Sequence, residues 1–487
     1  MSATRFRMRP GTTRRMAAAL AAAWFLVAAV LVPTAHAGMF SFDLKDEKKL
    51  GEQFNALIRS KLPLIQDTEI DDYVDGLVQR LARSMPPQPF PFTVSVINNN
   101  AVNAFAGPAG YVFVFTGLLI NMDHESEVAG VLAHELAHVT QRHIAKRMGE
   151  MQALSIGQLV GVLAGVLIGT ATQNYDVGGA VAMGSTAAAA TAYLKYSRDD
   201  ESEADQVGLN YLIAAGYRPQ GLLEAFEVLQ RLKFLQGGGT IPTYMSTHPG
   251  LVERTSYLRD RIKLLPADIR NRKENDAAFK RAQTLVRARY TDAKNAVAYY
   301  RKLGNNLTPL DKLGLAIAMS RSLDDIRQAK AAFEDALASS PNDAMFLREA
   351  GRYFLKIRDF SRAKSLLETA VRLKPNDIDS LFEYGRLLAQ EGNYRAAAPY
   401  LEQVCMRVPD NGEIRALYGQ VLGQAGDYFH AYLNLAYAAV YENNSQQARF
   451  QVDKAKAAAR TDADRRELAR LEETLNSRAE LLKKRMF

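Results

Sequence analysis

Apolar residues recur at helical spacing along most of the chain. The stripe formed by Ile70, Val74 and Leu77 is a clear example, and it ends ahead of a proline-rich turn. Two short segments, residues 92–97 and 111–117, have the composition of strands instead. We therefore expect a mainly α fold with a small β-sheet. Helices are predicted as a pair over 44–85 and singly over 123–151, 197–217 and up to about Leu235.

The two predicted strands flank a loop, expected over residues 103–110, where glycine and proline favour tight backbone geometry. This small sheet lies just ahead of the helix predicted over 123–151. Its edge could accept a substrate peptide as an extra strand, and a plain sheet core is the alternative.

The C-terminal part of the chain repeats itself. Pro341, Pro375 and Pro409 are 34 residues apart. The same spacing relates three further series, Gly351/Gly385/Gly419, Ala329/Ala363/Ala397/Ala431 and Phe360/Tyr394/Tyr428. A closing proline and small residues at this period resemble the tetratricopeptide repeat. We expect an α-solenoid of about four repeats over 308–442, preceded by connecting helices over 271–307 and followed by capping helices over 443–487.

Small residues dominate one internal segment. Glycines recur every fourth residue from Gly157 to Gly169, and a second small-residue run covers 177–192. Such faces let two helices approach closely. Each run is shorter than the ~20 residues that a membrane span needs. We expect a helical hairpin insert over 155–192, either buried or on a membrane surface, and contact with a bilayer stays open.

The N-terminus has the form of a secretory signal. Five arginines precede an uncharged run over 16–32, and the small-residue site Ala35-His36-Ala37 follows. We predict a signal peptide over 1–37 that is cleaved after Ala37. The alternative is an uncleaved anchor, because the run of 17 residues is long for a signal and short for a span.

The charge and the cysteine content narrow the partners and the cellular compartment that we expect for this protein. Without the five N-terminal arginines, 56 basic residues (61 − 5) stand against 53 acidic ones, a net charge of +3. No basic stripe is evident, so no nucleic-acid partner is expected. Cys405 is the single cysteine, so the protein has no internal disulfide, and we interpret this thiol as buried filler. Export without disulfides favours the bacterial periplasm, with possible association with the outer membrane.

The strongest chemical signal is the segment His134-Glu135-Leu136-Ala137-His138, which has the pattern HExxH. In a helix, His134 and His138 lie about one turn apart on one face. Two imidazoles at that separation can hold one Zn²⁺ at ~2.0–2.1 Å. Glu135 is then placed to take a proton from the attacking water. The alternative is a surface helix with two solvated histidines, and a third ligand decides between the two.

One candidate third ligand fails on geometry. His143 lies five residues past His138, ~140° round the helix, and cannot join the site without a break in the helix. We predict a solvated or capping histidine there. Gln141 and Ile144 occupy the positions where the metzincin pattern needs Gly and His, which excludes that class.

The acidic segment 197–205 offers a better ligand. Glu201 and Asp205 share a helical face, whereas Glu203 points away, ~200° round. Glu201 can bind zinc while Asp205 accepts a hydrogen bond from the free N–H of a ligating histidine and fixes its tautomer. Gly208, on the same side, permits close approach to the HExxH helix. The alternative is an exposed, acid-rich helix start.

Together these motifs resemble a known family. HExxH, the acidic segment 197–205 and His248-Pro249 followed by Glu253-Arg254 are similar to motifs of the HtpX and CAAX-prenyl-protease-type zinc peptidases. The segment Asn-Ala-Phe-Ala over 103–106 also looks like that family. With a signal peptide and tetratricopeptide repeats, the chain resembles the periplasmic β-barrel assembly-enhancing proteases. HtpX-type relatives carry membrane spans, and this chain has none after the signal, so we expect the site to face an aqueous compartment.

The resemblance implies a zinc metallopeptidase domain over 38–270 with one Zn²⁺. His134, His138 and Glu201 would ligate the metal. Glu135 would act as general base, and then as the acid that protonates the leaving amine.

Three further site residues follow from the resemblance. Asp205 would orient a ligand. His248 would stabilise the oxyanion or cap the zinc as a fourth ligand, and the alternative is an ordinary helix-start residue beside a proline. Arg254 is a second candidate for stabilising transition-state charge.

The implied function is that of a periplasmic endopeptidase and chaperone-like factor. Its partners would be protein and peptide substrates, including outer-membrane β-barrel proteins and their assembly machinery, recruited by the repeats. It would degrade stalled or misfolded clients. Two alternatives stay open: a mainly non-enzymatic scaffold with a latent peptidase, and a general housekeeping protease of the periplasm.

Overall fold

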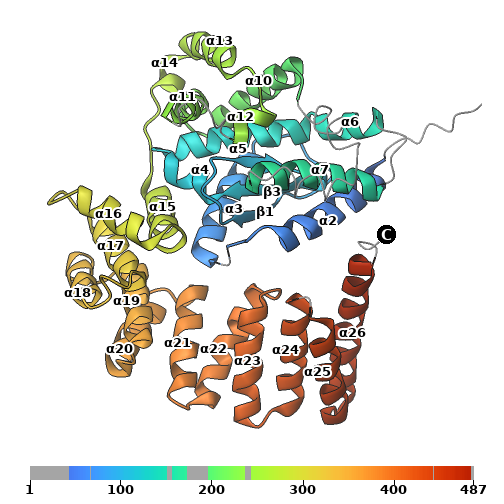
Figure 1. Cartoon of the computed structure of the whole chain (residues 1–487), viewed down its shortest axis with the longest axis vertical. Coiled ribbons are helices and arrows are strands. Elements are labelled where there is room, and N and C mark those ends of the chain that lie inside the picture. The colour runs from blue at the N-terminus through green and yellow to red at the C-terminus, as the bar shows by residue number, and fades with distance from the viewer. Residues whose placement is uncertain are drawn as a thin grey trace, which may run out of the picture. The chain divides into compact units, whose positions relative to one another are not determined.

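A computed structural model describes residues 43–65, 67–150, 156–172, 196–235, 243–442 and 444–483, and Figure 1 shows the chain. Helices account for most of this part, and one three-stranded sheet lies among the N-terminal helices. The predicted fold class is therefore confirmed. The predicted signal peptide lies outside the described residues.

The sheet consists of β1 (Thr93–Ile97), β2 (Ala104–Ala106) and β3 (Tyr111–Phe115), in the order β1-β3-β2. β1 runs parallel to β3, and β2 runs antiparallel to it. The loop predicted over 103–110 is wrong in part, since its residues Ala104–Ala106 form β2. Their hydrogen-bond partners lie on β3, which local spacing does not reveal. β2 is consequently a sheet edge, and it contacts α5 (Glu125–Thr140).

Helix α5 is the centre of the N-terminal half. Every residue from Glu125 to His138 is buried, because α10 and α11 pack along it. At Gly130 a Cβ atom would lie 2.6 Å from the backbone of Leu222, so only glycine lets α11 come this close. The surrounding helices are α2 (Leu44–Lys61), α3 (Thr68–Ala82), α4 (Thr116–Asn121), α10 (Arg198–Ala214), α11 (Gln220–Leu235), α12 (Thr243–Thr247), α13 (Leu251–Lys263) and α14 (Ala267–Arg270).

The single helix predicted over 123–151 is wrong, because it is broken. α5 ends at Thr140, Arg142 adopts a φ of 58°, and α6 (His143–Glu150) starts a new direction. A positive φ is uncommon for a residue with a side chain. Arg142 donates to Glu47 at 2.6 Å, a contact that helps hold this conformation. The break changes the position of His143, as described below.

The small-residue insert is described only for its first helix, α7 (Ile156–Thr172). α7 packs on α2, and Leu163, Ala164 and Ile168 are buried. The second half of the predicted hairpin, 177–192, lies outside the described residues. Within the part of the chain that the structure describes, none of the helices has both the length and the apolar character that a bilayer crossing requires.

The C-terminal half consists of successive helix pairs (Figure 1). A Cβ atom on Gly351 would lie 2.6 Å from Leu367, so the glycine of the repeat pattern allows the two helices of a pair to touch. The helices are α15 (Ala277–Tyr290), α16 (Ala293–Lys302), α17 (Pro309–Arg321), α18 (Ala329–Ser339), α19 (Ala344–Lys356), α20 (Phe360–Leu373), α21 (Ile378–Gln390), α22 (Tyr394–Arg407), α23 (Gly412–Ala425), α24 (Tyr428–Tyr441), α25 (Ser445–Ala458) and α26 (Asp462–Lys483).

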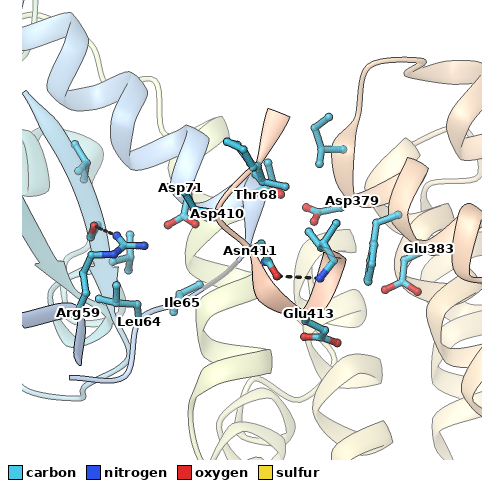
Figure 2. Close-up of a pocket in the computed structure, with 18 of the residues that line it drawn as sticks. Arg59, Leu64, Ile65, Thr68, Asp71, Asp379, Glu383, Asp410, Asn411 and Glu413 are labelled. Atoms are coloured by element: carbon cyan, nitrogen blue, oxygen red, sulfur yellow. Dashed lines mark hydrogen bonds between the residues drawn. The ribbon is translucent and has the colours of Figure 1, made fainter. Parts of the chain in front are cut away.

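Buried ion pairs join the repeats to α3. Arg348 on α19 donates to Glu69 at 2.6 Å, and Arg289 on α15 pairs with Asp67 and Glu349. Arg348 is 1% exposed. A groove of about 520 Å³ lies beside this junction. Figure 2 shows residues that line it, with Asp71 of α3 across from Asp379 and Glu383 of α21. The first repeats therefore pack directly against the helix that precedes the sheet.

Candidate metal centre

The candidate centre forms where α10 crosses α5. α5 carries His134 and His138, which are both fully buried, and α10 carries Glu201, which is 1% exposed. At Gly208 a Cβ atom would lie 3.0 Å from backbone atoms of residues 133 and 134, so the predicted close approach of the two helices at this glycine is confirmed. The serine N-cap of α10, Ser197, accepts from the Asp200 amide and sets where this helix begins.

Four side chains converge with the spacing of a metal site. The ligand atoms of His134, His138, Glu201 and His248 all lie within 4.8 Å of one another. The Nε2 atoms of His134 and His138 are 3.0 Å apart, and Nε2 of His134 is 3.4 Å from Nδ1 of His248. Glu201 lies 3.6 Å from each of the first two histidines. Donors at ~2.0–2.1 Å from a tetrahedral ion are about 3.3 Å apart, so these residues fit a metal ion of that kind.

The carboxylate of Asp205 orients His134. Its Oδ1 lies 2.9 Å from Nδ1 of His134, on the ring nitrogen opposite the converging ligand atoms. Arg254 donates to Asp205 from Nε and Nη2 at 2.7 Å each, and the Tyr257 hydroxyl donates at 2.7 Å. Burial alone would raise the pKa of Asp205, but the His134 hydrogen bond and the Arg254 charge hold it below its ordinary value. Asp205 is therefore a carboxylate that fixes a histidine tautomer with Nε2 free for a metal.

Arg254 also pairs with Glu201, so it lies behind the donor set and binds both carboxylates. Burial would raise the pKa of Glu201, but the neighbouring His248 and Arg254 lower it. Arg254 is 5% exposed. Because the guanidinium of Arg254 forms ion pairs with Glu201 and Asp205, it stabilises these two carboxylates in their charged form.

His143 differs from the prediction of a solvated or capping histidine. It is 1% exposed, and its Nδ1 lies 2.8 Å from Nδ1 of His138. The break at Arg142 brings it there, on the opposite side of His138 from the converging ligand atoms. Its Nε2 in turn lies 3.1 Å from Glu203, which is not among the four converging side chains. Both candidate ligand histidines on α5, His134 and His138, thus have a partner on the second ring nitrogen.

The remaining groups suit proton transfer. Burial raises the pKa of Glu135, and its Oε1 has no hydrogen-bond partner among the residues described. Nε2 of His248 lies 3.4 Å from that oxygen, and Nδ1 of His248 lies 2.9 Å from Glu201. Burial and the neighbouring imidazoles lower the pKa of His138 well below its ordinary value, which keeps it in the neutral form that binds metals.

The open space at the centre is small. A cavity of about 50 Å³ is lined by Glu135, His248, Leu163 of α7 and residues of β2. One water molecule needs ~10–15 Å³ of such space, so this cavity holds a few water molecules and not a peptide. Access to the centre therefore requires movement of a covering element.

Sequence reasoning missed three residues that contact the site. Tyr196 stacks on His138 with ring centroids 3.7 Å apart, and Tyr244 stacks on His248 at 4.3 Å. Asn103 lines the cavity and is 2% exposed, and its Oδ1 lacks a partner within the described part of the chain. The resemblance at 103–106 was a signal for Asn103. No local pattern marks the two tyrosines, because their proximity arises from the tertiary fold.

Models of known protein families match both halves of the chain. Residues 65–262 match the model of Peptidase family M48, which is a metallopeptidase family. Residues 321–378, 348–412 and 382–428 match the tetratricopeptide repeat. The described ligand residues on α5 and α10 and His248 all lie within the first match.

Several curated relatives are named as beta-barrel assembly-enhancing proteases. The chain is 32% identical over 222 residues to the beta-barrel assembly-enhancing protease of Yersinia pestis, covering 45% of each chain. It is 31% identical over 221 residues to the beta-barrel assembly-enhancing protease of Escherichia coli (strain K12), again covering 45% of each. The chain spans about half the length of the curated relatives it matches. The resemblance drawn from the motifs is thereby confirmed.

Solved structures of MamA also show similarity. One covers 34% of this chain and 97% of its own, at 16% identity and a TM-score of 0.29. A likeness at this level carries no argument about function.

Proposed function

We propose that this chain is a periplasmic zinc endopeptidase. A match to Peptidase family M48 is followed by matches to the tetratricopeptide repeat, and the chain is similar to beta-barrel assembly-enhancing proteases. In this proposal it acts in the assembly and quality control of outer-membrane β-barrel proteins and degrades stalled or misfolded clients. The observation that carries the peptidase part is the buried donor set with Glu135 beside it.

His134, His138 and Glu201 would hold the zinc ion. The ion would supply Lewis acidity, which polarises a peptide carbonyl and acidifies a water molecule. Glu135 takes the proton of the attacking water at its Oε atoms, and its raised pKa suits the later transfer of that proton to the leaving amine. Asp205 keeps the proton of His134 on Nδ1, so Nε2 stays available.

His248 would either stabilise the oxyanion or cap the metal ion as a fourth ligand, and its contacts favour the second role. Its Nδ1 lies among the ligand atoms, so it would act as a fourth ligand that occupies the place of water. The cavity of about 50 Å³ agrees with a peptidase that is closed at rest. Opening would have to move His248 and α7, after which β2 offers an edge to which a substrate strand could add.

The test of the peptidase is direct. The mature chain with zinc should cleave an unfolded protein substrate, and Glu135→Gln should slow cleavage by about 10²-fold or more. Glu227→Gln on the exposed face of α11 is the matched control and should cleave normally. Equal cleavage by wild type and Glu135→Gln would refute the peptidase proposal.

The role of His248 has its own readout. If His248 caps the metal, His248→Ala should raise the rate of cleavage of an unfolded substrate. If His248 stabilises the oxyanion, the same variant should lower that rate. The two outcomes have opposite sign, so one variant separates the two roles.

A non-enzymatic scaffold is the second candidate, and the closed cavity favours it. The repeats would recruit β-barrel clients and their assembly machinery whether or not the peptidase is open. If Glu135→Gln restores β-barrel assembly in a strain lacking the protein, scaffolding dominates. Periplasmic location rests on the predicted signal peptide and would be tested by fractionation of the source bacterium.

A further inference from the structure

A basic groove in the repeats lies apart from the metal centre. Its volume is about 830 Å³, and Arg321, Lys356 and Gln390, the last residues of α17, α19 and α21, line it. The lining contains six cationic side chains and one carboxylate, that of Glu349, a net charge of +5 (6 − 1). The cations are Arg289, Arg321, Arg352, Lys356, Arg358 and Arg386.

Half of these cations have no carboxylate partner among the described residues. Arg321 donates to the backbone carbonyls of Ala288 and Thr291, at 2.5 and 3.1 Å. Lys356 donates to the carbonyl of Ser320 at 2.8 Å, and Arg358 is exposed. A carbonyl satisfies the hydrogen bond but carries no net charge. These three side chains therefore form no ion pair with a carboxylate within the described chain, although the charge of Asp292 acts on Arg321.

The other cations are paired but retain free donors. Arg352 and Arg386 occupy equivalent positions in successive repeats, and both contact Glu383 at 2.5 Å. The Nε groups of Arg289 and Arg386 are buried and have no acceptor in the part of the chain described. A buried donor without an acceptor is unfavourable, so the described chain does not fully satisfy these two guanidinium groups.

Aromatic side chains also line the groove. Phe333 and Tyr353 stack with ring centroids 4.7 Å apart, and Phe360 also lines the groove. Such a surface suits apolar side chains that alternate with charged ones. The groove thus combines cationic donors with aromatic side chains, as expected for a peptide ligand and not for a free small anion.

We propose that this groove binds an acidic, extended segment of a partner protein, with its carboxylates facing Arg321, Lys356 and Arg358. The lining carries an excess of cationic side chains, so electrostatic complementarity favours an occupant that is rich in carboxylates. The neighbouring groove of Figure 2 has the opposite balance, with five carboxylates beside three arginines. The inference rests on the proposed role of the repeats as a surface that recruits proteins, and it names the chemistry of the partner.

The test uses fluorescence anisotropy. The probe is a labelled peptide of alternating Glu and Ser with one Phe, and a counterpart carries Lys in place of Glu. The protein is the full mature chain with Glu135→Gln, so that the probe is not cut. The acidic probe should bind, and binding should weaken with salt because the Debye length falls from ~10 Å at 0.1 M to ~3 Å at 1 M.

Two matched variants locate the site. Lys356→Gln/Arg358→Gln should weaken binding of the acidic probe about fivefold, since it removes two unpaired charges. Arg372→Gln/Lys374→Gln removes the same charge outside the groove and should leave binding unchanged. Vesicles of anionic phospholipid are the third probe and should show no dependence on the groove variant.

Several outcomes would overturn the inference: no binding of the acidic probe, equal binding of the basic counterpart, equal weakening by both variants, or groove-dependent binding of vesicles in place of peptide. The proposed peptidase can fail separately. A wild-type chain that binds the acidic probe but never cleaves an unfolded substrate would refute the peptidase and leave the groove intact.

Discussion

We expect Gly208 to set the distance between the two helices that carry the candidate metal ligands, and Gly208→Ala tests this. The new Cβ would lie 3.0 Å from the Ala133 oxygen and from N and Cα of His134. These are backbone atoms of a buried helix, so α10 must shift by a few tenths of an ångström to reach ordinary contact. Metal sites tolerate about ±0.2 Å in the distance from ligand to metal. A shift of α10 would therefore move the Glu201 carboxylate to the edge of the distance at which it can bind the ion.

The expected change in the free energy of unfolding of Gly208→Ala follows from two opposing contributions. Overpacking costs about 1–3 kcal/mol, and replacing a helical glycine by alanine returns about 0.8–1 kcal/mol. Gly208→Ala should therefore lose about 0–2 kcal/mol of unfolding free energy without metal. Gly76→Ala is the matched control, since a Cβ there meets nothing within 4 Å, and it should gain about 0.5–1 kcal/mol.

The assay has two parts. Chemical denaturation of the metal-free proteins gives the free energies of unfolding, and competition with a chromogenic chelator gives the zinc affinity. Gly208→Ala should bind zinc about tenfold more weakly, whereas Gly76→Ala should bind as wild type does. If Gly208→Ala gains stability like the control and keeps its zinc affinity, helix spacing does not set the ligand geometry.

Three further predictions concern residues around the centre and the groove of Figure 2. His143→Phe removes the contact on Nδ1 of His138 and should lower zinc affinity about 10–100-fold by chelator competition, while unchanged affinity would mean that His143 only fills space. Arg254→Met leaves two buried carboxylates unpaired and should cost about 3–5 kcal/mol in denaturant unfolding without metal; a neutral result would show that water replaces the guanidinium. Burial and the charge of Asp67 raise the pKa of Asp71 from 3.8 to about 8. Between these two pH values the native state holds a proton on Asp71 that the unfolded state has lost, so the free energy of unfolding falls as pH rises. Asp71→Asn should therefore raise the free energy of unfolding by about 1–2 kcal/mol at pH ~8 but not at pH ~4 in paired thermal melts. An equal offset at both pH values would contradict this.

Local chemistry explains what the sequence predicted well. The 34-residue period identifies the repeats because each helix pair needs small residues where its helices touch, as Gly351 does against Leu367. HExxH and the i,i+4 pair of Glu201 and Asp205 are readable because helical spacing alone places such residues on one face. Those residues do converge in the structure.

Residues whose role depends on long-range contacts were not readable. β2 forms because β3 supplies its hydrogen-bond partners, and the stacked Tyr196 and Tyr244 reach the histidines from separate segments. Neither fact leaves a periodic trace in the chain.

The sequence by itself predicted the repeats and the candidate metal-binding residues, since both predictions depend on the fixed geometry of the α-helix. Only the tertiary structure decided the surroundings of those residues. A positive φ at Arg142, helped by Glu47 from a distant helix, redirects the chain and brings His143 onto His138. A single backbone angle outside the helical range overrides the spacing rule, and the contacts that stabilise it are tertiary.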